Sequence, residues 1–243
     1  VRLWAVILWL LVWQMAAAAL NQDILLVSPV RVLLRLSEMV REGAFWTSID
    51  FSAVRIITGF LLATLCAIVL AVVSACRPRA EQLLAPIMLA IKSIPVASFI
   101  ILALILFSSR NLAVLISFLM VLPVIYTGVL GGIRAMDVHL TEMAMLFHLA
   151  AGRRMRYVYL PQVLPYFRSA CVAALGLCWK SGIAAEVIGM PIGSIGERLQ
   201  QAKVYLDTPD LFAWTLVIVM VSLAFERLFL WLLDCFTVRL RRM

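Results

Sequence analysis

Charged residues are scarce in this sequence, at 14% of its 243 residues, whereas 65% are hydrophobic. A soluble domain has about 25% charged residues. The composition therefore excludes an ordinary soluble protein and predicts an all-α, polytopic membrane protein whose surroundings are the lipid bilayer. The net charge of +8 requires no nucleic-acid partner, because excess Lys and Arg normally lie in the cytoplasmic loops of membrane proteins.

Cysteine, histidine and lysine are also few, and each scarcity excludes a class of site. The five cysteines form no Cys-x-x-Cys pair, and the two histidines are too few for a metal centre. None of the three lysines follows a glycine, so the sequence has no Walker A loop for ATP. An intramembrane enzyme would need paired aspartates or a His–Glu cluster at one depth, and no such set is evident. The sequence thus predicts no catalytic residue, metal or cofactor in this chain.

Six apolar runs have the length of about 20 residues that a helix needs to cross the hydrocarbon core. Each must be helical there, because lipid offers the backbone no hydrogen-bond partner. We predict one transmembrane domain over residues 1–243. Its expected spans are at about 3–20, 51–75, 83–107, 111–134, 164–188 and 211–235.

The first apolar run has a second interpretation. Arg2, the apolar core and four alanines also resemble a signal peptide with a small-residue cleavage site. The first residue, Val1, leaves open that the N-terminus is trimmed or begins at a non-ATG codon. The run is long enough for a retained span, which is the interpretation used here.

Basic residues in the short connections indicate the orientation. They favour a topology with both termini in the cytoplasm, since Lys and Arg accumulate in cytoplasmic loops. The segments then placed inside hold Arg2, Arg77, Arg79, Arg153, Arg154, Arg156, Arg239, Arg241 and Arg242.

An amphipathic pattern follows the first run. Ser28 can cap a helix, Pro29 fits its first position and Gly43 can end it. We expect this helix to pack on the outer membrane surface or against the spans, and a docking surface for an external partner is the alternative. Its apolar face consists of Val32, Leu33, Leu36, Met39 and Val40.

The loop 135–163 is a polar, arginine-bearing insert between two predicted spans. Asp137 is a good N-cap for a helix over 138–150, which Gly152 would end. The segment 158–161 is then expected to turn the chain back toward the fifth span. This order predicts an ordered element that a partner protein can bind. A solvated basic loop that only sets the topology is the alternative.

This loop resembles the EAA loop of ABC importer permeases, in which Glu-Ala-Ala precedes a glycine and an Ile-x-Leu-Pro end. Met143 replaces the first alanine, and His148 occupies the glycine position, so that His148 alters the local bend or Gly152 supplies the break instead. The register is kept at Glu142, Ala144, Val158, Leu160 and Pro161.

The resemblance extends over nearly the whole chain, to permeases of the taurine, sulfonate and nitrate type. It is carried by SPVRVLLRLSEMVREGAFWTSIDFSAVRIITGFLLAT, IKSIPVASFIILALILF and CWKSGIAAEVIGMPIGSIGERLQQAKVYLDTPDLFAW. It implies a type I importer permease in a bacterial inner (plasma) membrane. Two permease chains pair, as a homodimer in the simplest case. A cytoplasmic ATPase dimer supplies ATP and Mg²⁺ chemistry, and an external binding lipoprotein delivers the solute. ATPase coupling is thereby assigned to Glu142, Met143, Ala144, His148, Gly152, Leu160 and Pro161.

Ionisable groups inside predicted spans are costly and usually face a cavity or a partner. Lys92, Lys180 and Glu186 are such groups. One interpretation is structural, with a snorkelling lysine or an ion pair between Lys92 and Glu186. The other is a translocation path lined by Lys92, Ser93, Trp179, Lys180 and Glu186. Two lysines there favour a small anion such as a sulfonate or nitrate, although the same family also moves pyrimidine and other vitamin precursors.

Three glycines, Gly189, Gly193 and Gly196, follow the fifth predicted span. They either form turns or give an external gate the backbone freedom to flex. For the whole chain, the resemblance implies the transmembrane subunit of an ATP-driven importer. An ion-gradient-driven secondary transporter or channel is the alternative, and it leaves the loop 135–163 unexplained.

Overall fold

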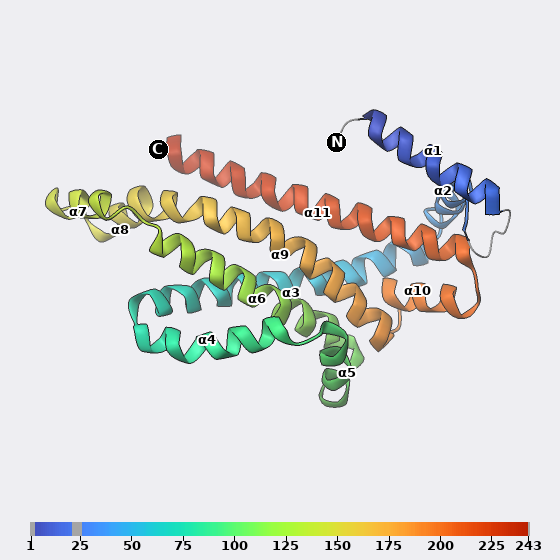
Figure 1. The fold of residues 1–243 in the computed structure, drawn as a ribbon, viewed down its shortest axis with the longest axis horizontal. Coiled ribbons are helices and arrows are strands. Elements are labelled where there is room, and N and C mark those ends of the chain that lie inside the picture. Colours follow the sequence, from blue (N-terminus) through green and yellow to red (C-terminus); the bar gives the residue numbers. More distant parts are fainter. Residues whose placement is uncertain (1–2, 21–25, 243) are drawn as a thin grey trace.

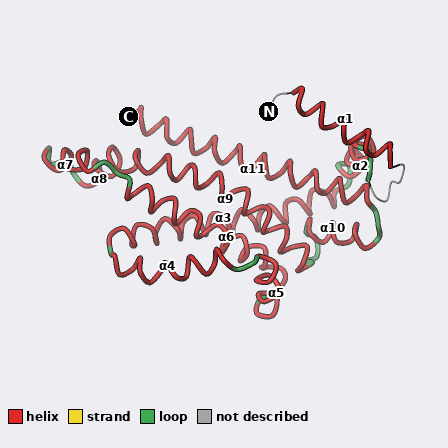
Figure 2. Tube along the Cα trace, viewed as in Figure 1, coloured by secondary structure: helices red, strands yellow, loops and turns green. Residues whose placement is uncertain are grey.

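Four long helices run along one common axis in the computed structural model, which describes residues 3–20 and 26–242 (Figure 1). The described residues form helices joined by short connections, with no strand among them (Figure 2). Each long helix is apolar and long enough to cross a membrane. They are α3 (Gly43–Cys76), α6 (Ser109–Arg134), α9 (Leu160–Gly189) and α11 (Thr208–Arg242).

The other two predicted spans differ from this pattern. The first is α1 (Leu3–Leu20), whose apolar stretch Ile7–Leu20 is shorter than those of the four long helices. The predicted span 83–107 is not one straight helix. It consists of α4 (Pro78–Ser93) and α5 (Val96–Leu106), which meet at an angle of 105°.

A proline explains the bend between α4 and α5. Pro95 has no N–H to continue the helix, and its ring disfavours the helical conformation for the preceding residue. Ile94 is accordingly extended, with φ −76° and ψ 128°. In Figure 1, α5 projects away from the long helices, below the end of α4.

Small residues allow α6 to lie at the centre of the bundle. A Cβ on Gly59 of α3 would lie 2.6 Å from the Val114 carbonyl oxygen, and one on Gly128 would lie 2.4 Å from the Ala170 Cβ. Such close backbone approach is typical of packed transmembrane helices. In consequence 61% of the most apolar stretch of α6 is buried, against 6% for that of α11, which lies at the edge of the bundle with its side chains mostly half-buried or exposed.

The two ends of the molecule carry different short helices (Figure 1). At one end lie α2 (Pro29–Met39) and α10 (Ile195–Val204), beside the start of α11. At the other end lie α7 (Val138–Leu146) and α8 (Ala151–Arg154). The long helices therefore separate two surfaces that are available to different partners.

The predicted amphipathic helix is α2, and it packs against the bundle. Ser28 Oγ accepts a hydrogen bond from the Arg31 N–H at 3.4 Å, which confirms the predicted cap. Val32 and Met39 are buried in the core. The expected end at Gly43 is wrong, because the helix stops at Met39 and Gly43 begins α3 after a tight turn.

Candidate functional site

The start of α7 is fixed by two side chains. The Asp137 carboxylate accepts a hydrogen bond from the His139 N–H at 2.8 Å and caps the helix. The backbone N–H of Asp137 donates to Gln162 Oε1, also at 2.8 Å. Gln162 belongs to α9, and its Nε2 donates to the Val158 carbonyl at 2.9 Å. The first turn of α7 is therefore tied directly to the next long helix.

The end of α7 is formed at His148. Its φ is +49°, the left-handed conformation that usually requires glycine. The His148 N–H donates to the Met145 carbonyl at 2.9 Å, and the Leu149 N–H donates to the Ala144 carbonyl at 3.1 Å. This pair of bonds is the Schellman motif, which satisfies the last carbonyls of a helix. The residue at the expected glycine position thus adopts the glycine conformation.

The expectation that Gly152 ends the helix over 138–150 is wrong. The helix stops at Leu146, and Gly152 lies inside α8. A helix-ending residue needs the left-handed conformation in this motif, and His148 already supplies it.

The expected turn at 158–161 is also wrong, because the chain there is helical. Met155–Tyr159 form one turn of π-helix that leads directly into α9. The Leu160 N–H donates to the Met155 carbonyl, five residues earlier. Pro161 has no N–H, and a wider turn is one way in which a helix accommodates this loss. Leu160 and Pro161 are half-buried at the start of α9.

The surface of α7 combines one buried anchor with exposed apolar side chains. Ala144 is fully buried, whereas Met143 is exposed. Leu146 and Phe147 are 77% and 70% exposed at the extreme end of the molecule. Glu142 is also exposed, and its Oε2 lies 4.0 Å from Nδ1 of His139. Large apolar side chains grouped in this way are typical of a protein interaction surface.

The second candidate region lies at the break between α4 and α5. Lys92 is exposed, and its Nζ lies 3.5 Å from Oγ1 of Thr127 on α6. Ser93 donates to the Leu89 carbonyl within its own helix at 2.9 Å. At its other end α4 is held to α6 by an ion pair between Glu81 and Arg134.

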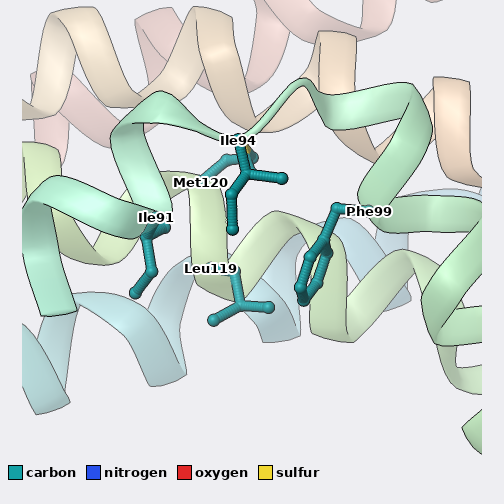
Figure 3. Close-up of a pocket in the computed structure, with 5 residues that line it drawn as sticks. All are labelled: Ile91, Ile94, Phe99, Leu119 and Met120. Atoms are coloured by element: carbon teal, nitrogen blue, oxygen red, sulfur yellow. The ribbon is translucent and has the colours of Figure 1, made fainter.

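A small apolar hollow lies beside this break (Figure 3). The side chains of Ile94 and Phe99 approach it from the broken segment, and Leu119 and Met120 belong to α6. Ile91 completes the lining, and none of these five side chains is polar. The hollow therefore offers no polar group to a solute.

The predicted path residues on α9 point in different directions. Lys180 is exposed, but Trp179 is buried, with its ring 6.2 Å from that of Phe225. Glu186 is fully buried, and its Oε2 accepts from Ser52 Oγ at 2.7 Å. The structure does not bring the five predicted residues into one cluster, and only Lys92, Ser93 and Lys180 are open to the surroundings.

The alternative ion pair between Lys92 and Glu186 is not formed within the described part of the chain. The amino group of Lys92 contacts Thr127, whereas the carboxylate of Glu186 contacts Ser52 and Gly196. Sequence reasoning missed Ser52, Thr127 and Gln162. Of these, only Gln162 carried a signal, since it directly follows Pro161 of the motif.

At the opposite end, Arg35 joins α2 to α11. Its guanidinium contacts both carboxylate oxygens of Asp210, with Nη2 at 3.2 Å from Oδ2. Hydrogen bonding to Asp210 raises the pKa of Arg35 above its ordinary value. Arg198 of α10 lines the same small polar hollow as this pair. Helices α2 and α11 are therefore held together by an ion pair as well as by apolar packing.

Comparison with known proteins points to one group of transport proteins. The model of the family described as "binding-protein-dependent transport system inner membrane component" matches residues 59–242. The putative aliphatic sulfonates transport permease SsuC of Bacillus subtilis is 24% identical over 197 residues, which cover 80% of this chain and 71% of that protein. The taurine transport system permease TauC of Escherichia coli is 23% identical over 220 residues, which cover 88% of this chain and 80% of that protein. The bicarbonate transport system permease CmpB of Synechococcus elongatus is 24% identical over 192 residues, which cover 79% and 69%.

A solved structure has the same fold. This chain is similar to a chain in the crystal structure of an amino acid ABC transporter with histidines, with a TM-score of 0.54 and 18% sequence identity. The match covers 85% of this chain and 96% of that one. At this identity the likeness concerns the fold, which is the arrangement of membrane helices described above.

Proposed function

The chain belongs to the family of binding-protein-dependent transport system inner membrane components, and we propose that it works with a second permease chain, a cytoplasmic ATPase dimer and an external binding lipoprotein. It is the permease subunit of an ABC-type importer, in line with the relatives that it resembles over about four fifths of its length. Its role is transport across the inner membrane. In the proposed assembly the partner ATPase binds and hydrolyses ATP.

We assign six spans to the chain, with both termini in the cytoplasm. Four helices meet the length and apolarity of a span, the bent pair α4–α5 supplies a fifth, and α1 supplies the sixth. The end that carries α7 and α8 faces the cytoplasm, because Arg153, Arg154 and Arg156 lie there. The end that carries α2 and α10 then faces outward, toward the binding protein.

The fixed and exposed geometry of α7 is the observation that supports ATPase coupling at residues 135–163. Gln162 holds the start of the helix, and the Schellman motif at His148 closes its end. Leu146 and Phe147 remain exposed between these two fixed points. A rigid helix with an apolar tip is suited to a groove on another protein and transmits a push from that protein to α6 and α9.

The exposed lysines support a path for a small anion. Lys92 and Lys180 lie within apolar helices and are open to the surroundings of the single chain. A charged side chain in a span faces protein or a water-filled cavity instead of lipid. We therefore place the path beside these two lysines, with the second permease chain covering them from the lipid. Relatives named for sulfonates, bicarbonate and taurine favour a small anion over a vitamin or pyrimidine precursor.

Recovery of ATP hydrolysis with the tagged chain tests this function. The chain is extracted from its native membranes in mild detergent, purified through the tag and assayed for ATPase activity. We expect an ATPase to co-purify and its activity to rise when external proteins from the same cells and a candidate anion are added. Purification of a folded chain with no associated ATPase would exclude the ATP-driven importer in favour of a gradient-driven transporter or channel.

A further inference from the structure

A fully buried carboxylate joins three helices at the outer end of the molecule. Glu186 of α9 accepts hydrogen bonds at Oε2 from Ser52 Oγ of α3, at 2.7 Å, and from the Gly196 N–H of α10, at 3.3 Å. Ser52 Oγ in turn accepts from the Ile195 N–H at 2.9 Å. Glu186, Ser52 and Ile195 are all completely buried. The first N–H groups of a helix have no acceptor within that helix. At the start of α10, two of them are bonded by side chains of α3 and α9.

Packing leaves α10 no freedom to slide at this point. A Cβ on Gly196 would lie 2.4 Å from the carbonyl carbon and the Cβ of Glu186. Only glycine fits at so short a distance, so Gly196 serves close contact and not flexibility. The expectation of a flexible glycine gate is therefore not favoured at this position.

The chain between α9 and α10 is equally constrained. Met190 ends α9 in the left-handed conformation, with φ +44°, and Gly193 has φ +85°. Ser194 caps α10 by accepting from the Glu197 N–H at 3.0 Å, and Glu197 accepts from the Gly193 N–H at 2.5 Å. The tip of this turn is Ile192, whose side chain is 87% exposed. A stiff turn thus presents one large apolar side chain at the outer end of the bundle.

We propose that Glu186 and Ser52 are positioning residues that lock the start of α10 onto α3 and α9 and thereby fix Ile192 at the outer mouth of the transport path. The segment 190–196 then moves only together with the long helices. Opening of the mouth is a movement of whole helices, and the turn itself does not flex. The transport consequence rests on the proposed function, whereas the lock itself does not.

The lock depends on hydrogen-bond acceptance and not on an ion pair. Within the described chain no Lys or Arg donates to Glu186. Arg55, the one basic residue of α3, donates from Nε to the Arg110 carbonyl at 2.8 Å and from Nη1 to the Phe51 carbonyl at 2.9 Å. Both contacts of the carboxylate are made by one oxygen, Oε2. The amide oxygen of glutamine can accept the same two bonds, whereas alanine can accept neither.

A spin label at position 192 measures the lock directly. The label is attached to Ile192→Cys in the full chain, with the exposed thiols removed by Cys76→Ser and Cys235→Ser. The lock variants are Ser52→Ala, Glu186→Ala and Glu186→Gln. Thr64→Val is the matched control, because Thr64 is a hydroxyl residue of α3 that bonds only to its own helix, at the Phe60 carbonyl. Mobility of the label is recorded in nanodiscs by electron paramagnetic resonance.

We expect Ser52→Ala and Glu186→Ala to increase the mobile fraction of the label about tenfold, because each removes a buried hydrogen-bond acceptor and leaves a backbone N–H group at the start of α10 without its partner. Glu186→Gln and Thr64→Val are expected to leave the spectrum unchanged. A spectrum that stays immobile in Ser52→Ala would overturn the lock. A mobile label in the Glu186→Gln variant would overturn the claim that the lock rests on hydrogen-bond acceptance. If the Glu186→Ala variant does not fold, the Ser52→Ala variant still tests the lock.

The transport consequence has its own readout. In the complex with its ATPase, Ser52→Ala is expected to raise ATP hydrolysis in the absence of solute several-fold, while Thr64→Val stays at the wild-type rate. If Ser52→Ala makes the label mobile but leaves basal ATP hydrolysis unchanged, the lock serves only the stability of the fold, and its proposed role at the mouth is overturned. The label experiment uses the permease alone, so its failure leaves the proposed ATP-driven transport standing.

Discussion

The backbone amide of Leu149 donates a hydrogen bond to the carbonyl oxygen of Ala144 at 3.1 Å. The intervening residue His148 has φ +49°, so α7 ends without a glycine. A non-glycine residue in the left-handed conformation costs about 1–2 kcal/mol. This local strain lies at the tip of the proposed coupling element, where position and stiffness determine how a partner is held.

Replacement of His148 tests whether this conformation matters. His148→Gly is expected to keep or raise the local stability by up to about 1 kcal/mol, and His148→Val to lower it by about 1–2 kcal/mol, because a β-branched residue is more strained at positive φ. Hydrogen exchange of residues 144–150 gives the measurement. His139→Val is the control, since His139 lies in the helical part of α7. Equal protection in the glycine and valine variants would contradict the Schellman geometry.

Reversal of the charge on Glu142 tests the docking surface. Its carboxylate is exposed, and its Oε2 lies 4.0 Å from Nδ1 of His139, which is also exposed. Glu142→Lys is therefore expected to leave the spans folded but to reduce the amount of co-purified ATPase about tenfold, which corresponds to about 1.4 kcal/mol. Glu38→Lys, an exposed glutamate of α2 at the opposite end, is the control. Unchanged recovery with Glu142→Lys would mean that α7 does not bind the ATPase at this residue.

Removal of the Gln162 amide separates binding from transmission. Gln162→Leu takes away the acceptor of the Asp137 N–H and is expected to loosen the start of α7 by about 1 kcal/mol. The ATPase should still co-purify, but its stimulation by solute should fall. Gln201→Leu, which removes only an exposed contact with Glu197 on α10, provides the comparison. Normal stimulation in Gln162→Leu would show that the bond between Asp137 and Gln162 does not couple the ATPase to the spans.

Neutralisation of the intramembrane lysines tests the anion path. Lys92→Met and Lys180→Met keep the length of the side chain and remove its charge. Each is expected to abolish most of the solute-stimulated ATPase activity while basal hydrolysis persists. Lys203→Met changes the remaining lysine, which lies in α10 at the outer end, and should have little effect. Normal stimulation in both intramembrane variants would exclude these lysines from solute recognition.

The attachment of α2 is testable through Asp210. Asp210→Asn removes the charge that Arg35 contacts through two nitrogens, and we expect a loss of about 1.5–3 kcal/mol in unfolding free energy. Glu38→Gln removes the more exposed partner of the same guanidinium and should cost less than about 0.5 kcal/mol. Thermal unfolding in detergent compares the two. Equal losses would mean that Asp210 is no more important than a surface ion pair.

The sequence predicted those elements that local patterns determine. Apolar runs located the long helices, and Ser28 with Pro29 located the start of α2. Pro95 also predicts a bend, because a proline disfavours the helical conformation at the preceding residue, Ile94. The continuous apolar run over 83–107 instead favoured a single straight span.

The remaining features depend on residues that are distant in the chain. Nothing local to Ser52 indicates a contact with Glu186, which is 134 positions away. An ionisable residue within a span predicts a structural or functional role for Glu186, yet only the tertiary structure shows that its carboxylate contacts α10. The end of α7 was misplaced for a different reason. Glycine is the usual residue in the left-handed conformation, so the sequence predicts an end at Gly152 and leaves open whether His148 alters the bend.

Uptake into proteoliposomes tests the central claim most directly. Vesicles containing the purified chain, its co-purified ATPase and the external binding protein are supplied with labelled taurine, an alkanesulfonate, nitrate or bicarbonate. We predict uptake of at least one of these solutes that requires ATP on the side of α7, and none when the ATPase is omitted. Uptake of equal rate by vesicles that contain the permease alone, without ATP, would contradict the account.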